Sequence, residues 1–356
     1  MNSLRPTDSS PETDFTLYDG LGYVEALTHL AHQTERGDRL ALSTMSLEPS
    51  EQPVDQLLPA LAESARRGTD VTLLVDSYAL LVDSGSRDLG PLLIPYTSRT
   101  FAQRLNALDS LQEAGVTVAL TNEPPHYLSN PFAGRSHIKG AVINDSVFLG
   151  GPNLHDVDRI DASMQITNPD LADFLYDILG RIAKSGQTKQ TITDGRRAFA
   201  DGSSLLFDAG YKNQSHIQGE ARRLIASVNE ADQLLLATQF VPRGALVKDL
   251  AAAHERGADI SLIFTPPSGK NAVMTASEWF AFHALKKALP SALMDELILP
   301  TNKPVHAKCI VTPRQVLIGS HNFDPRGIKF GTAEIAYLRQ STDLGKILAK
   351  HLLGQC

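Results

Sequence analysis

The sequence lacks the features that mark secreted, membrane-spanning and nucleic-acid-coating proteins. Only two of its 356 residues are cysteines, one inside an apolar run and one at the last position, so no disulfide framework is expected. No apolar run approaches the ~20 residues that span a bilayer, because Asp76 interrupts the longest candidate, at 71–82. The net charge of −7 provides no excess of basic residues for a nonspecific nucleic-acid surface.

The chain also lacks the glycine-rich patterns that hold nucleotides, of the G-x-G-x-x-G and Walker types, so ATP-dependent transfer has no support. Residues 1–14 are polar and contain Pro6 and Pro11, without the basic leader and apolar centre of a secretory signal. We expect them to form a disordered tail. Together these absences favour a cytoplasmic protein whose contact with a membrane is peripheral.

What the chain does contain is one stretch that occurs twice with the same internal spacing. The first copy begins with His-x-Lys at 137–139 and the second with His-x-Lys at 306–308. In both copies a glycine lies 13 residues after the histidine (150 − 137 and 319 − 306), and an asparagine lies 16 residues after it (153 − 137 and 322 − 306). Apolar runs on both sides of a short turn predict a β-hairpin in each copy.

Each hairpin is expected to present three polar side chains at one spot. Alternate residues of a strand share a face, so the histidine and the lysine point the same way, and the glycines allow a close approach to a ligand. A fixed cation, an amide donor and an imidazole that serves as nucleophile or acid together suit a phosphate. The candidate catalytic residues are His137, Lys139 and Asn153 in the first copy, and His306, Lys308 and Asn322 in the second.

These frames resemble the paired HxK…G[GS]xN motifs of the phospholipase D superfamily, and the resemblance covers nearly the whole chain. Gly-Gly-Pro-Asn at 150–153, paired with Gly-Ser-His-Asn-Phe-Asp-Pro-Arg at 319–326, is most similar to the cardiolipin synthase branch. The superfamily has an aspartate seven residues after each histidine, where this chain has Asn144, followed by Asp145, and Pro313. We interpret the difference as a changed hairpin turn.

The resemblance implies two carboxylates and three substrate contacts. Glu334 matches the superfamily glutamate that hydrogen-bonds the histidine of its own domain, and Asp161 occupies the similar place after the first motif. A carboxylate on one ring nitrogen fixes the tautomer and raises the basicity of the other nitrogen. Gly151, Ser320 and His321 are the expected substrate-binding residues, although a spectator role fits His321 equally well.

A longer repeat surrounds the motif. Arg-Gly-Thr-Asp-Val at 67–71 matches Arg-Gly-Ala-Asp-Ile at 256–260, an offset of 189 (256 − 67), whereas the histidines are 169 apart (306 − 137). The first copy therefore carries 20 extra residues (189 − 169), which we place in the loop at 80–98. Hydrophobic periodicity predicts helices at 23–36, 54–67 and 217–229, and strands at 39–46, 70–76 and 232–240.

The alternation of helices and strands predicts two tandem α/β domains, and the resemblance implies that they are phospholipase D-like, each a mixed sheet flanked by helices, packed as a pseudo-twofold dimer. The expected boundaries are a tail at 1–14, a first domain at 15–185, a linker at 186–202 and a second domain at 203–356.

Two apolar segments allow more than one interpretation. The loop at 80–98, apolar from Leu89 to Tyr96, packs on its own domain or forms a lid or a lipid contact. For Trp-Phe-Ala-Phe at 279–282, on a helical segment, burial in the core is favoured over contact with a membrane.

By resemblance, the protein is expected to cleave a phosphodiester through a phosphohistidine, with His137 as nucleophile and His306 as acid. No cofactor or metal is expected, because a lysine beside each histidine opposes a bound cation and itself supplies positive charge. The leading hypothesis is a monomeric phosphatidyltransferase of the cardiolipin synthase type, or a phospholipase D, acting on phospholipids at a membrane surface. A nuclease of the same superfamily is the main alternative, which the acidic balance disfavours, and an inactive phosphate-binding scaffold is the third.

Overall fold

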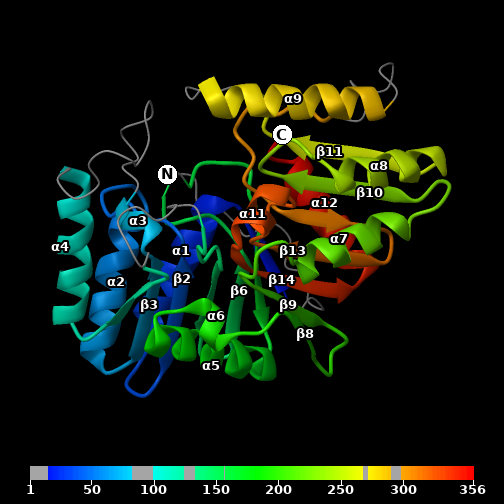
Figure 1. Ribbon diagram of the computed structural model, residues 1–356. Helices are drawn as coiled ribbons and strands as arrows, with labels where there is room; N and C mark the ends of the chain where they lie inside the picture. The colour runs from blue at the N-terminus through cyan, green and yellow to red at the C-terminus, as the bar shows by residue number, and fades with distance from the viewer. Residues whose placement is uncertain (1–14, 82–98, 124–132, 156, 268–271, 290–297) are drawn as a thin grey trace.

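The computed structural model describes residues 15–81, 99–123, 133–155, 157–267, 272–289 and 298–356. Within them each half of the chain forms a seven-stranded mixed sheet flanked by helices (Figure 1). The strand order is β1-β7-β6-β5-β2-β3-β4 in the first sheet and β11-β10-β12-β13-β14-β9-β8 in the second. The expected fold of two α/β halves is confirmed. The expected tail and most of the loop at 80–98, including Leu89 to Tyr96, lie outside the described residues.

The strands of the first sheet are Phe15–Tyr18 (β1), Arg39–Thr44 (β2), Asp70–Asp76 (β3), Thr117–Thr121 (β4), Gly140–Ile143 (β5), Ser146–Gly150 (β6) and Ser163–Thr167 (β7). Those of the second are Gly195–Ala198 (β8), Ser204–Ala209 (β9), Gln233–Thr238 (β10), Asp259–Phe264 (β11), Cys309–Val311 (β12), Gln315–Gly319 (β13) and Ala333–Gln340 (β14). The helices are Gly20–Gln33 (α1), Val54–Arg67 (α2), Tyr78–Leu81 (α3), Arg99–Glu113 (α4), Pro169–Ser185 (α5), Thr188–Thr191 (α6), His216–Ala226 (α7), Ala245–Glu255 (α8), Ala272–Ala288 (α9), Pro325–Phe330 (α11) and Thr342–Leu353 (α12).

The two sheets share the same run of six neighbouring strands. The run β1-β7-β6-β5-β2-β3 corresponds to β9-β14-β13-β12-β10-β11. The first sheet adds β4 beside β3, and the second adds β8 beside β9. Since β8 and α6 fall within 186–202, the stretch expected to be a linker also contributes an edge strand to the second sheet.

Local sequence signals set several element boundaries. The expected helix at 54–67 and strand at 70–76 coincide with α2 and β3. Helix α1 begins at Gly20, three residues before the expected start (23 − 20), because the Asp19 side chain caps it and accepts a hydrogen bond from Gly22 N at 2.7 Å. Asp208 lies 189 residues later (208 − 19) and likewise accepts from His216 N, at the start of α7, at 2.7 Å.

Both faces of each sheet are buried. Along β6, Val147 and Leu149 point into a central apolar cluster, whereas Phe148 points into a cluster under α1, α2 and α4. A third cluster lies under α7, α8 and α9 on the outer face of the second sheet. The central cluster contains residues of both halves, including Leu175 of α5 and Leu348 of α12, so the two halves share one core.

No helix among the described residues is both long and apolar enough to cross a lipid bilayer.

Candidate active site

The two motif histidines lie where the halves meet, and backbone contacts between the halves hold them there. His137 N donates to Ala333 O at 2.8 Å, and His306 N donates to Ile160 O at 2.7 Å. Each acceptor is the residue directly before an expected catalytic carboxylate. The segment that carries each histidine is therefore held beside the carboxylate-bearing segment of the other half.

As a result, each histidine contacts a carboxylate that belongs to the other half. His137 Nδ1 lies 3.0 Å from Glu334 Oε2, and His306 Nδ1 lies 2.7 Å from Asp161 Oδ2. The expectation that Glu334 serves the histidine of its own domain is wrong. The reason is the pair of interdomain backbone contacts, which place Glu334 and Asp161 beside the histidine of the opposite half.

Each carboxylate has further hydrogen-bond partners that fix its position. Ser320 Oγ donates to Glu334 Oε2, and Ala162 N donates to Asp161 Oδ1 at 2.8 Å. Burial raises the pKa of the Glu334 carboxyl to about 7 and also raises the pKa of Asp161. Because both carboxylates engage Nδ1, the Nε2 atom is the ring nitrogen left for chemistry in both histidines.

The motif lysines complete a buried set of charges. Lys139 Nζ lies 3.1 Å from His306 Nε2, so this lysine also reaches across to the other half. Lys308 Nζ donates to the carbonyl oxygen of His306. Burial, followed by the charges of the two lysines, holds the pKa of both histidines below its usual value. Burial likewise lowers the pKa of Lys308 to about 8, and lowers that of Lys139.

The motif glycines allow close packing at the end of each hairpin. Gly150 and Gly151 have positive φ angles of 85° and 82°, a conformation that favours glycine. A Cβ at Gly319 would lie 2.3 Å from Ile335 O. Asn153 and Asn322 follow these turns, and the Oδ1 atom of each is buried without a hydrogen-bond partner in the described structure. Such atoms cost free energy unless a ligand satisfies them.

His321 has structural contacts. Its Nδ1 accepts a hydrogen bond from Phe323 N at 2.9 Å, and its Nε2 lies 4.0 Å from Asp208 Oδ2. The ring is 4% exposed. These contacts explain its position as part of the turn that carries Asn322, and they favour the spectator role over substrate contact.

The position at which the superfamily has an aspartate lies in a hairpin turn, as expected. Asn144 connects β5 to β6 with a φ of 52°, and its Oδ1 accepts a hydrogen bond from Arg39 N at 3.2 Å. Asparagine tolerates this left-handed conformation better than most residues do. The turn is on the opposite end of β5 from His137.

Sequence reasoning missed the residues that anchor the two histidine segments. Asp76 ends β3 and accepts from Ser136 N at 2.5 Å, while Thr265 follows β11 and its Oγ1 accepts from Val305 N at 2.9 Å. The two anchors are offset by 189 residues (265 − 76), so the longer repeat contained the signal. Arg159 was also missed, and its charge contributes to lowering the pKa of His306.

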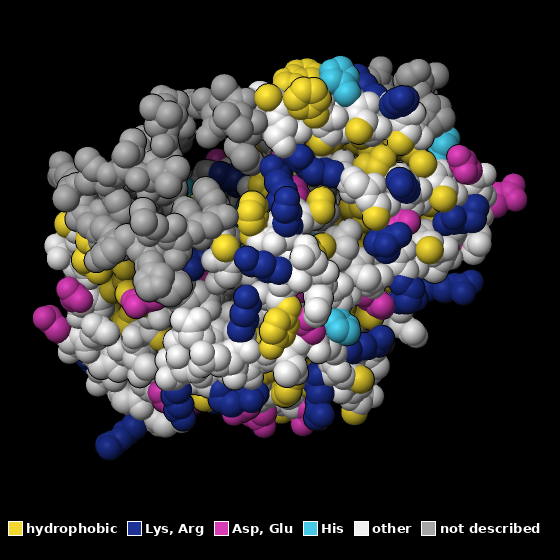
Figure 2. Space-filling view, in the orientation of Figure 1, with side chains coloured by type: hydrophobic (Ala, Val, Ile, Leu, Met, Phe, Trp, Pro, Cys, Tyr) yellow, Lys and Arg dark blue, Asp and Glu magenta, His cyan; other side chains and the backbone are white. Residues whose placement is uncertain are grey.

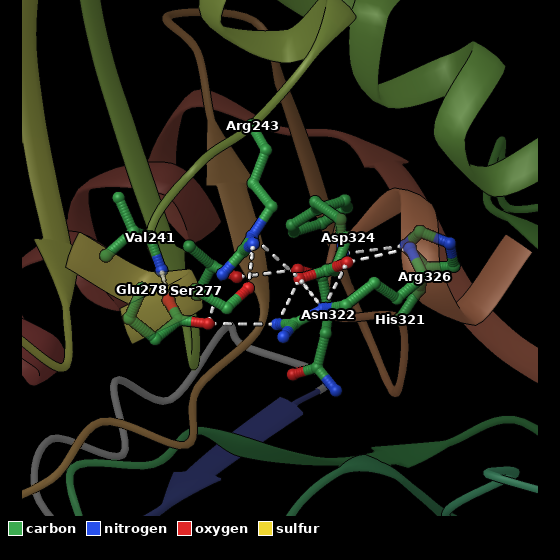
Figure 3. A network of polar contacts seen from close by, with 10 residues as sticks. Val241, Arg243, Ser277, Glu278, His321, Asn322, Asp324 and Arg326 are labelled. Carbon is green, nitrogen blue, oxygen red and sulfur yellow. Dashed lines mark hydrogen bonds and ion pairs between the residues drawn. The ribbon is translucent and has the colours of Figure 1, made fainter. Parts of the chain in front are cut away.

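A network of ion pairs adjoins the second motif (Figure 3). Asp324, two residues after Asn322, lies 3.3 Å from Arg243 Nε and 2.6 Å from Arg326 Nη2. Glu278 of α9 pairs with both arginines and accepts from Val241 N at 3.1 Å. Helix α9 is thereby tied to the segment that carries Asn322.

Among the described residues, no group of three or more His, Cys, Asp or Glu side chains is arranged to hold a metal ion.

Comparisons with known proteins concern the second half of the chain and the overall fold. Residues 221–352 match the family described as cardiolipin synthase, PLD-like domain. No curated protein sequence matches the chain. Among solved structures, phosphatidylserine synthase of Haemophilus influenzae is similar with a TM-score of 0.70 and 14% identity, over 95% of this chain and 84% of that one.

Two further structures share the fold. Polyphosphate kinase of Porphyromonas gingivalis is similar with a TM-score of 0.58 and 16% identity, over 96% of this chain and 50% of that one. Yeast tyrosyl-DNA phosphodiesterase is similar with a TM-score of 0.50 and 12% identity, over 92% and 88%. At these identities the likeness concerns the fold.

Proposed function

We propose that the chain, whose residues 221–352 match the family described as cardiolipin synthase, PLD-like domain, is a phospholipase D-like enzyme that transfers or hydrolyses phosphodiesters through a phosphohistidine, with phospholipids as substrates. The observation that carries the proposal is the pair of histidine–carboxylate contacts exchanged between the halves, at 3.0 and 2.7 Å. Each half alone has a histidine without its carboxylate. The assembled site has two histidines, each with a carboxylate of the other half, and a two-step displacement at phosphorus needs one nucleophile and one acid.

In the first step, the Nε2 lone pair of one histidine attacks phosphorus, and the P–O bond to the leaving alcohol breaks. The other histidine donates its Nε2 proton to the leaving alkoxide. In the second step, that histidine takes a proton from the acceptor alcohol or water, whose oxygen displaces the phosphohistidine. By analogy with the superfamily, His137 is the nucleophile and His306 the acid.

The charges around the histidines suit this reaction. Lys139 and Lys308 are buried cations next to the histidines, and they would stabilise the negative charge that develops on the phosphoryl oxygens. Asn153 and Asn322 follow the motif glycines, and their side-chain NH2 groups would donate hydrogen bonds to the phosphoryl oxygens of a bound phosphodiester. Glu334 and Asp161 would stabilise each imidazolium as it forms.

Two findings favour a lipid substrate. The matching family is described as cardiolipin synthase, PLD-like domain, and phosphatidylserine synthase has a similar fold over 95% of this chain. The finer proposal is that a lipid alcohol, rather than water, resolves the phosphohistidine. Water is the more abundant acceptor, so this outcome depends on positioning of the lipid alcohol. The enzyme would then act as a monomer at the membrane surface.

The decisive experiment compares phosphatidylglycerol vesicles with single-stranded DNA as substrates. Mass spectrometry of the products should show a diphosphatidyl lipid and free glycerol. Phosphatidic acid alone would make the protein a hydrolase. DNA cleavage without a lipid product would indicate a nuclease, and the absence of any product, with both substrates bound, would indicate an inactive scaffold.

A further inference from the structure

Helix α9, Ala272–Ala288, is apolar on two opposite faces. Its inward face contributes Ala281 and Leu285 to the third core cluster. Its outward face carries exposed side chains at the helical spacing of three and four residues: Ala276, Trp279, Phe280, His283, Ala284 and Lys287. Helices with apolar residues all round are normally buried, so the outward face of α9 is unusual for a surface helix.

The two aromatic residues on this face are far from buried. Phe280 is 76% exposed and Trp279 is 46% exposed, so the expected burial of this pair in the core is wrong. Ala281 and Phe282 lie on the side of the helix that packs against the third core cluster, so Trp279 and Phe280 are left on the exposed side. Figure 2 shows hydrophobic and histidine side chains along the exposed top of the second half, where Figure 1 places α9.

The charges of α9 are segregated as well. Glu278 is the single acidic residue of the helix, and it is turned toward Arg243 and Arg326. Lys286 and Lys287 are exposed. In a chain with 40 acidic and 33 basic residues, this helix therefore presents aromatic and cationic groups without an exposed carboxylate. That combination complements an anionic lipid surface.

The position of α9 connects this face to the site. Glu278 is the residue directly before Trp279, and it joins the ion-pair network that ends at Asp324, next to the turn carrying Asn322 (Figure 3). Helix α9 is thereby fixed relative to the second motif. A surface bound by Trp279 and Phe280 would hold the second half of the site at a defined position.

We propose that α9 is an interfacial docking helix, whose Trp279 and Phe280 side chains insert into an anionic lipid surface. This inference rests on the lipid substrate of the proposed function. Tryptophan suits the boundary between acyl chains and headgroups, because its ring is largely apolar and its N–H finds a polar partner. The exposed lysines would contact anionic headgroups beside the inserted rings.

The chain offers a direct probe, because Trp279 is its single tryptophan. Tryptophan fluorescence, excited selectively over that of the eight tyrosines, therefore reports on α9 alone. The wild type is mixed with phosphatidylglycerol vesicles that contain lipids brominated on the acyl chain, which quench only fluorophores inserted among the chains. Phe280→Ser keeps the probe, and Leu353→Ser on α12 is the matched control, since Leu353 is 49% exposed on another helix.

We expect the vesicles to quench Trp279, and Phe280→Ser to weaken vesicle binding about tenfold or more, while Leu353→Ser binds like the wild type. Turnover of bis(p-nitrophenyl) phosphate, a soluble phosphodiester, should be the same in all three proteins. Unquenched Trp279, or unchanged binding of Phe280→Ser, would overturn the proposal. So would a dimer that Phe280→Ser dissociates, since the face would then bind a second copy. Quenching without any lipid product would support α9 docking and reject the lipid reaction.

Discussion

Each motif histidine uses Nδ1 for a carboxylate of the opposite half, so Nε2 is the nitrogen that the proposed mechanism uses. The Lys139 ammonium, 3.1 Å from His306 Nε2, adds a third contact between the two halves. Both halves contribute side chains to the surroundings of each histidine. When one of these side chains is lost, the corresponding side chain of the other half therefore cannot take its place. The histidines are therefore expected to have separate and non-redundant roles.

We expect His137→Ala and His306→Ala each to reduce phosphodiester turnover by at least about 10²-fold to 10⁴-fold, because each removes a nucleophile or a general acid. Both proteins should stay folded, since the central core does not depend on the rings. Turnover of phosphatidylglycerol and far-ultraviolet circular dichroism measure the two effects. A folded variant with nearly the wild-type rate would contradict the mechanism.

The pH dependence of the rate should be bell-shaped. Burial raises the pKa of Glu334 to about 7, so its charge, which supports His137, is lost as the pH falls through that value. Burial lowers the pKa of Lys308 to about 8, so its positive charge is lost as the pH rises through that value. The profile of kcat/KM should therefore be highest between these two values.

Lys308→Arg is the matched test of the alkaline limb, because arginine stays charged throughout this range. Its rate should be lower than that of the wild type, and its decline above pH ~8 should disappear while the acidic limb remains. An alkaline limb that is identical in both proteins would assign that limb to another group.

At the scale of elements, the ends of two equivalent strands hold the histidine segments by different chemistry. Asp76, the last residue of β3, accepts from Ser136 N and pairs with Arg135 at 3.2 Å, and it is buried. Thr265, after β11, uses its hydroxyl group to accept from Val305 N at 2.9 Å and to donate to Val305 O at 3.2 Å. The first anchor is ionic and the second is neutral, although each binds the residue directly before a motif histidine.

This difference predicts unequal costs. Asp76→Ala leaves the buried Arg135 guanidinium without its carboxylate and should lower the free energy of unfolding by on the order of 3–5 kcal/mol. Thr265→Val removes neutral hydrogen bonds and should cost about 1 kcal/mol. Urea denaturation near neutral pH measures both. Equal losses in the two variants would show that the ionic anchor has no special role.

At the scale of the whole molecule, motif spacing and apolar periodicity, which are local signals, predicted the duplicated α/β fold and six of the catalytic candidates. The two carboxylates, Glu334 and Asp161, were indicated by the family resemblance. The sequence did not predict which histidine each carboxylate contacts. The two contacts join residues 197 and 145 positions apart, and they depend on how the halves pack. The exposure of Phe280 was missed for a related reason, because an apolar pattern does not indicate which of two faces becomes buried.

The shared core makes the two halves interdependent. Helix α6 belongs with the first half, since Thr188 N donates to Asn122 Oδ1 at 3.1 Å, and β8 belongs with the second, since it pairs with β9. A break between them, at 192/193, therefore separates the chain with little loss of local structure. Each fragment alone would expose its part of the central cluster, in which Leu175 and Leu348 come from opposite halves.

We expect fragments 1–192 and 193–356 to be inactive and poorly soluble when each is produced alone, because each lacks the carboxylate of its histidine and the apolar partner of its core surface. Produced together, they should assemble and recover phosphodiester turnover. Introducing Glu334→Gln into the second fragment should lower the recovered rate through His137, which lies on the first fragment. Turnover by either fragment alone would show that one half can supply both histidine and carboxylate, and the exchanged pairing would then be unnecessary for catalysis.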